Sequence, residues 1–83
     1  PFNPSTKISW QSPIAGHQSL KVYDVLGNVI TTLVDEERPA GKYDTSFNAS
    51  GLASGIYFYR IAIHSDKLQI GTYVETKKMI VLR

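Results

Sequence analysis

Alternating apolar and polar residues fill short runs of this chain, and turn residues separate the runs. Near the start, Ile8 and Trp10 alternate with Lys7 and Ser9. Alternation with a period of two predicts a half-buried strand, here with Ile8 and Trp10 facing the core. Residues 43–47 repeat this pattern and predict a second half-buried strand.

Two β-rich runs in the middle of the chain predict a hairpin. Residues 19–26 and 29–34 are separated only by Gly27 and Asn28. A pair of this kind between apolar runs is typical of a tight turn, because glycine adopts positive φ without a steric clash. The alternation in the first run blurs after Val22, which predicts a bulge or a change of face at that point.

Two polar segments are expected to be loops. Residues 35–41 are rich in charge, and Pro39 suits position i+1 of a type I turn, which places Gly41 at i+3. Residues 48–55 are small or polar apart from Leu52. A single large apolar residue in such a loop is expected to cover one end of the core.

Three further apolar runs complete the set, at residues 56–63, 68–75 and 78–82. The first has apolar residues on both faces, which is typical of a central strand. About seven strands at spacings of roughly 8–12 residues predict an all-β fold, an immunoglobulin-like antiparallel β-sandwich. An open barrel is the alternative, and the lack of cysteine excludes only an antibody-type domain.

The composition is that of one small globular protein. The chain has 83 residues, 42% hydrophobic and 19% charged, so we expect residues 1–83 to be a single domain. A formal net charge of +2 is too small for a nucleic-acid partner. No apolar run reaches the ~20 residues of a membrane-spanning helix. The chain starts without Met or a secretory leader, so we expect a module excised from a larger secreted protein.

The titratable residues do not group into a catalytic or metal site. His17 and His64 lack the spacing of zinc ligands, and residues 35–37 lack the Asp-x-Asp-x-Asp-Gly ladder of a calcium loop. No serine lies in a Gly-x-Ser-x-Gly elbow. The sequence therefore predicts a protein that is not an enzyme and that binds no cofactor or metal.

The aromatic residues leave a second class of function open. Those on predicted core faces are Trp10, Tyr43, Tyr57 and Tyr59, and burial is the expected role of such rings. Phe58 and Tyr73 are better placed as exposed platforms for stacking against sugars. The alternative function is therefore a carbohydrate-binding or spacer module appended to a secreted enzyme, with polysaccharide as its partner.

The chain ends in an apolar run flanked by basic residues, Lys77-Lys78-Met79-Ile80-Val81-Leu82-Arg83. We call residues 77–83 the terminal segment. As the last strand of a sheet it is expected to be an edge strand, whose basic residues discourage aggregation. A receptor can also bind such a segment, by adding a strand to its edge or by capturing the free carboxylate.

Three blocks of residues stand in a fixed order along the chain. They are Pro1-Phe2-Asn3-Pro4-Ser5-Thr6-Lys7-Ile8, Leu20-Lys21-Val22-Tyr23-Asp24-Val25-Leu26-Gly27, and Ser54-Gly55-Ile56-Tyr57-Phe58-Tyr59-Arg60, followed by the terminal segment. In this order they resemble the C-terminal sorting domain, type A, of the type IX (Por) secretion system of Bacteroidetes. An immunoglobulin-like domain of the flagellar hook-capping protein shares part of the middle blocks but not the terminal basic motif.

The resemblance implies a sorting signal with no chemistry of its own. It implies that the parent cargo is recognised in the periplasm, passes the outer-membrane translocon, and meets a sortase-like peptidase on its way to the cell surface or the medium. By position, residues 77–83 are the implied recognition signal. Asn3 and Pro4 mark the start of the domain, and Gly27, Gly55 and Tyr57 are motif positions. Arg83 stands where the family often has Lys.

Overall fold

The structure is a computed structural model that describes residues 5–65 and 72–82. Six strands and no helix form this part of the chain. In chain order they are β1 (Ser5–Ser12), β2 (Gly16–Tyr23), β3 (Val29–Arg38), β4 (Gly41–Asn48), β5 (Gly55–His64) and β6 (Thr72–Val81). β-branched and aromatic residues are frequent in these runs, and such residues favour the pleated strand.

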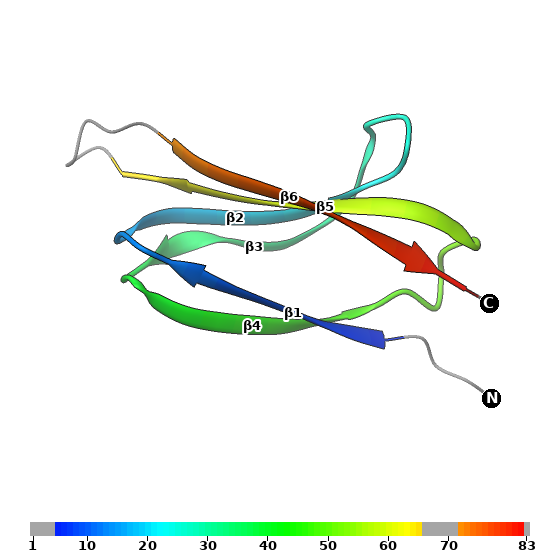
Figure 1. The fold of residues 1–83 in the computed structure, drawn as a ribbon, viewed down its shortest axis with the longest axis horizontal. Coiled ribbons are helices and arrows are strands. Elements are labelled where there is room, and N and C mark those ends of the chain that lie inside the picture. Colours follow the sequence, from blue (N-terminus) through cyan, green and yellow to red (C-terminus); the bar gives the residue numbers. More distant parts are fainter. Residues whose placement is uncertain (1–4, 66–71, 83) are drawn as a thin grey trace.

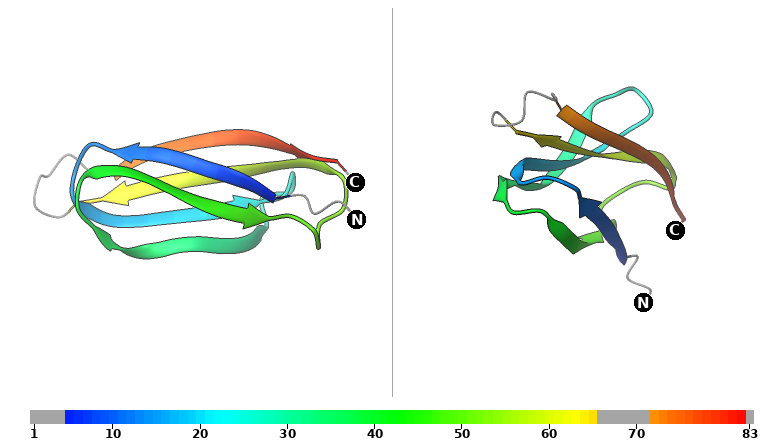
Figure 2. Two further views of the ribbon diagram at one scale, coloured as in Figure 1. Left: turned by 90° about the horizontal axis from the view of Figure 1, so that it is seen from below. Right: turned by 60° about the vertical axis from the view of Figure 1, so that its left-hand side comes forward.

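The strands form two antiparallel sheets. One sheet has the order β3-β2-β5-β6, and the other consists of β1 and β4. Figure 1 shows the two-stranded sheet lying across one face of the four-stranded sheet, and Figure 2 shows the layers from two further sides. The predicted antiparallel sandwich of immunoglobulin-like kind is confirmed, with β5 inside its sheet as expected.

The expected number of strands, about seven, is corrected to six within residues 5–65 and 72–82. The sequence predicts separate strands at residues 68–75 and 78–82, but β6 is a single unbroken strand. The residues between the two runs stay in the ladder, where Thr76 pairs with Arg60 of β5. Because β5 offers ten consecutive residues for pairing, a short polar stretch does not end its neighbour. Residues 68–71 lie outside the described residues.

The core lies between the two sheets and is built from the inward faces of their strands. Its buried apolar residues are Ile8, Trp10, Leu20, Val22, Val34, Phe47, Ala49, Tyr57, Ile61, Ile63 and Val81. Trp10 is only 8% exposed, which confirms the predicted register of the first strand. Burial of each large apolar side chain contributes about 1.5–3 kcal/mol before the entropy of folding is counted.

The pairing of β2 with β3 is irregular near the predicted position, but the extra residues belong to β3. Between the pairs made by Leu20 and Lys21, β3 contributes one additional residue, Leu33. A second addition, Ile30, lies between the pairs made by Val22 and the next residue of β2. β2 itself keeps strict alternation of buried and partly buried residues, so its sequence pattern blurs after Val22 only because the strand is about to end.

The turn between β2 and β3 has five residues, 24–28, rather than the predicted two. Asp24 organises it, since its Oδ1 accepts hydrogen bonds from the backbone N–H groups of Leu26 and Asn28, both at 2.9 Å. Gly27 donates its N–H to the Asp24 carbonyl at 3.1 Å and has a φ of 89°, which favours glycine. The hairpin prediction is right, and its turn type is wrong because the side chain of Asp24 stabilises a wider loop.

The polar segment 35–41 is mostly strand rather than the predicted loop. β3 continues through Arg38 and β4 begins at Gly41, so only Pro39 and Ala40 lie between them. The charged residues fit in β3 because it is an edge strand with a solvated side. Tyr43 fixes this turn by donating its hydroxyl proton to the Pro39 carbonyl.

The loop that precedes β5 is tied to the body of the sandwich at two points. Leu52 packs against the buried core, as predicted. Tyr57 donates its hydroxyl proton to the carbonyl of Ala53 at 2.9 Å, while its ring is buried. The loop therefore has its backbone held by a side chain of the strand that follows it.

Candidate recognition surface at the terminal strand

β6, which contains most of the terminal segment, is an edge strand of the four-stranded sheet, as predicted. It pairs with β5 along ten residues without a register shift. Within residues 5–65 and 72–82, no strand pairs with its other side. A regular edge of this kind presents backbone N–H and C=O groups to a partner.

The alternation of β6 divides the terminal segment between two faces. Val81 is 6% exposed and belongs to the core, and Met79 packs against that core. Ile80 and Leu82 are 62% and 73% exposed. The terminal segment is thus anchored by one set of side chains and displayed by the other. Arg83, the last residue of the predicted signal, lies outside the described residues.

The two lysines of the terminal segment have different surroundings. Lys77 lies 3.7 Å from Oε1 of Glu75, two residues earlier on the same side of β6. Lys78 lies on the opposite side and pairs across the ladder with Phe58. Among the described residues the structure gives Lys78 no ion pair, so its charge remains free for a partner.

Lys78 shares its face with other cations and with aromatic rings. Arg60 of β5 lies over the ring of Tyr23 at 5.1 Å from its centroid, and its Nε donates to Thr76 at 3.4 Å. Lys21 pairs with Arg60 across the ladder. Neighbouring strands thus place three basic residues, Lys21, Arg60 and Lys78, on the outer face of the four-stranded sheet.

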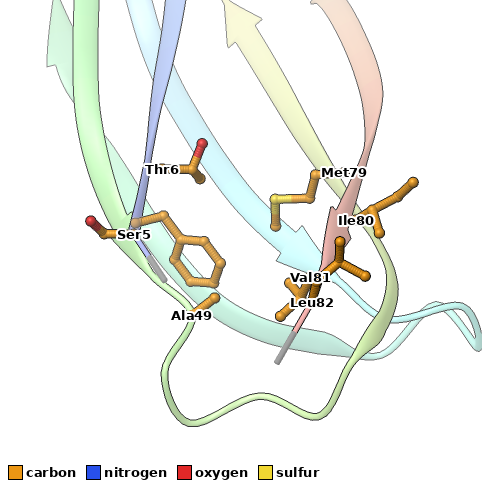
Figure 3. Close-up of a pocket in the computed structure, with 8 residues that line it drawn as sticks. Ser5, Thr6, Ala49, Met79, Ile80, Val81 and Leu82 are labelled. Atoms are coloured by element: carbon orange, nitrogen blue, oxygen red, sulfur yellow. The ribbon is translucent and has the colours of Figure 1, made fainter. Parts of the chain in front are cut away.

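A cleft of about 250 Å³ lies between the end of β6 and the sheet formed by β1 and β4. It is lined by Ser5, Thr6, Phe47, Ala49, Met79, Ile80, Val81 and Leu82. Figure 3 shows Thr6 and Met79 extending into the space between β1 and β6, while Ile80 points away from it. The cleft exists because the two-stranded sheet leaves the edge of the larger sheet uncovered.

Exposed apolar residues gather at this same end of the sandwich. The start of β1 and the end of β6 lie there together (Figure 1). Ile56 pairs with Ile80 across the ladder, and both are exposed. Val25 and Leu26, in the turn after β2, are 64% and 81% exposed. Clustering of such residues marks a surface suited to contact with another protein.

A family model described as the secretion system C-terminal sorting domain matches residues 1–82. The chain belongs to this family. It is a C-terminal sorting signal for type IX secretion, and it directs export across the outer membrane toward the cell surface. Its function implies interaction with the type IX machinery. No curated protein and no solved structure matched the chain.

The residues that the resemblance implies as motif positions have structural roles where the structure describes them. Gly27 allows the turn after β2, and Tyr57 holds the loop before β5. Gly55 opens β5 and pairs with Val81 of β6. Asn3 and Pro4, the predicted start of the domain, lie outside the described residues.

The other candidate sites of the sorting domain do not come together. His17 Nε2 lies 2.5 Å from Oδ1 of Asp35, but no group of three potential metal ligands forms within residues 5–65 and 72–82. Phe58 and Tyr73, the predicted sugar platforms, lie on opposite faces, since Phe58 pairs with Lys78 and Tyr73 with the buried Ile63. They cannot form one stacking surface.

The described part of the sorting domain has no helix of the length and apolar character needed to cross a bilayer.

Sequence reasoning missed two features of the recognition surface. It did not place Thr6 and Phe47 beside the terminal segment, although Thr6 is two residues before Ile8 and so lies on the same face of β1. It also did not bring Arg60 onto Tyr23, because this contact depends on the pairing of distant strands.

Proposed function

We propose that the type IX machinery binds this domain through the terminal segment, residues 77–83. The observation that carries the proposal is the position of β6, an exposed and unpaired edge among the described residues. Its outward side chains Ile80 and Leu82 are largely exposed, and Lys78 has a free charge. These features offer a partner backbone, apolar and electrostatic contacts on one strand.

The domain acts, in this proposal, as a sorting signal without catalytic activity or cofactor. Residues 1–83 form a single C-terminal module of a larger cargo protein. The module is recognised in the periplasm, guides its cargo through the outer-membrane translocon, and is then a substrate of a sortase-like peptidase. The order of these steps follows from the location of an outer-membrane exporter, which receives its cargo from the periplasmic side.

Deletion of the whole terminal segment is a poor test, because it removes Val81 from the core. Point substitutions on the exposed side of β6 separate recognition from folding. Residues 1–83 are fused to a periplasmic reporter in a host that has a type IX system, and surface delivery is measured. Ile80→Ser is expected to reduce delivery at least about tenfold, the effect of losing about 1.4 kcal/mol of binding.

Val74→Ser is the matched control. Val74 is also an exposed apolar residue of β6, at 52%, but it precedes the terminal segment. Both substitutions should change the free energy of unfolding by less than about 0.5 kcal/mol, as is usual at exposed positions. If Ile80→Ser and Val74→Ser are delivered equally well, the terminal segment is not the recognised surface.

A further inference from the structure

The free edge of β6 differs from the other edge of its sheet in a way that favours strand addition. β6 keeps its register over ten pairs without a shift, so its outer backbone groups are regularly spaced. β3, the opposite edge, carries two extra residues and a run of charged side chains, Asp35, Glu36 and Glu37. Irregular and charged edges resist added strands, which leaves β6 as the receptive one.

The cleft gives side chains of an added strand a place to pack. A strand beside β6 extends the four-stranded sheet over the gap next to β1, and every second side chain then faces the sandwich interior. Met79 and Val81 of β6, with Phe47 of β4, form an apolar wall at that position. A volume of about 250 Å³ suits a few apolar side chains rather than a whole domain.

The basic residues on the outer face of the sheet favour an acidic side chain on the corresponding face of the added strand. Lys78 points away from the cleft, on the face that also carries Arg60 and Lys21. Within the described residues, the strand carboxylates on that face are Asp35 and Glu37 of β3, which lie toward the end of β2 that contains His17. A carboxylate on the added strand therefore finds an unpaired cation beside it.

We propose that β6 binds an extended segment of the secretion machinery as an added strand. Alternate apolar side chains of that segment enter the cleft between β6 and β1, and an acidic side chain contacts Lys78. This inference rests on the proposed function and specifies the chemistry of the partner. The partner is a polypeptide segment with apolar residues on one face and a carboxylate on the other.

The decisive variant changes the cleft without changing the terminal segment. Thr6→Trp places a large ring in the space between β1 and β6, and Thr32→Trp makes the same replacement at an exposed position of β3, away from the cleft. In the secretion assay, Thr6→Trp is expected to reduce delivery at least about tenfold, while Thr32→Trp stays within about twofold. Equal delivery of both variants overturns the inference.

A second pair of substitutions covers the case in which the tryptophan disturbs folding. Thr6→Asp brings a charge to the apolar cleft, and Thr32→Asp is its control, with thermal unfolding measured for all four proteins. Delivery should again fall only for the Thr6 variant. If Ile80→Ser is delivered as well as Val74→Ser, the proposed function fails, and the strand-addition inference fails with it. If Ile80→Ser reduces delivery but both Thr6 variants are delivered as well as their Thr32 controls, only the strand-addition inference fails.

Binding by backbone pairing is tested with a defined probe. An acetylated peptide of alternating valine and threonine with one central aspartate is titrated into isotope-labelled chain 1–83 and followed by nuclear magnetic resonance. Amide signals of β6 and of Thr6 are expected to shift and to exchange more slowly with solvent. Changes confined to β3, or no changes at all, overturn the inference.

Discussion

The indole Nε1 of Trp10 donates a 3.0 Å hydrogen bond to Oε1 of Gln18, and this buried bond joins the two sheets. Trp10 lies on β1, in the small sheet, and Gln18 lies on β2, in the large one. Gln18 is 1% exposed, and within the described residues its Nε2 has no hydrogen-bond partner. The core therefore holds a glutamine whose side-chain NH2 group is unsatisfied, and its side-chain oxygen is the acceptor for the Trp10 N–H.

Removal of the Gln18 oxygen should therefore depend on what occupies position 10. Gln18→Leu leaves the Trp10 N–H buried without an acceptor, whereas Phe at that position has no such donor. We expect Gln18→Leu to be less destabilising in a Trp10→Phe background than in the parent chain, by about 1–3 kcal/mol. Urea unfolding of the four proteins measures this difference. A value below about 0.5 kcal/mol would show that the bond does not couple the sheets.

Trp10 also contributes through the volume of its ring. The ring is buried and stacks on Tyr43, with centroids 5.8 Å apart. Trp10→Ala is expected to lower the free energy of unfolding by roughly 3–5 kcal/mol, because it leaves a large cavity between the sheets. Circular dichroism and urea titration measure the loss. A loss typical of a surface substitution would contradict the register of β1.

Local pattern predicted the strands that have one solvated face and one core face. Ile8 and Trp10 alternate cleanly with polar residues and are inward, as expected. The pattern failed where a second interaction decided the outcome. Pairing with β5 carries β6 through Thr76, and the carboxylate of Asp24 widens the turn that Gly27 and its neighbour were expected to form alone.

The candidate site was predictable only where it depends on the pattern of a single strand. The basic flanks of the terminal strand favour an edge position, and its alternation in a half-buried strand exposes every second side chain. The cleft does not, because Phe47 and Met79 meet only when the two sheets pack. Lys77 and Lys78 are adjacent in sequence, so a strand places them on opposite faces, and the structure adds that Lys77 has Glu75 beside it whereas Lys78 lies opposite Phe58.

The turn at Asp24 should make stability depend on pH in the acid range. The backbone N–H of Asn28, which donates to the carboxylate, is the main reason that the pKa of Asp24 lies below its ordinary value of 3.8. A carboxyl whose pKa is lower in the folded state stabilises the fold above its unfolded pKa, and this contribution is lost as the pH falls through the folded pKa.

Asp24→Asn removes this titration while keeping an acceptor oxygen at the turn. We expect the parent chain to lose more stability than Asp24→Asn as the pH is lowered from about 5 to about 2. Thermal unfolding of both proteins across this range provides the comparison. A constant difference in stability between them at every pH would contradict the assigned role of the carboxylate.

Tyr57 should stabilise the loop before β5 through its hydroxyl group as well as its ring. Its hydrogen bond to the Ala53 carbonyl is 2.9 Å long, so Tyr57→Phe is expected to cost about 0.5–1.5 kcal/mol. Tyr59→Phe is the control on the same face of the same strand, since the described residues provide no partner for its hydroxyl. Equal free energies of unfolding for the two variants would refute the loop anchor.

The two lysines of the terminal segment should differ in their effect on secretion. Lys77 has Glu75 beside it at 3.7 Å, whereas Lys78 has no described ion pair. Neutralising Lys78 removes a charge that a partner can use directly, so Lys78→Gln is expected to reduce reporter delivery more than Lys77→Gln. Both residues are exposed, and both variants should unfold within about 0.5 kcal/mol of the parent.

Because screening weakens exposed charges, the difference between Lys77→Gln and Lys78→Gln should shrink when salt is added to a purified binding assay. A larger defect for Lys77→Gln would place the recognised charge on the cleft side of β6 rather than on its outer face.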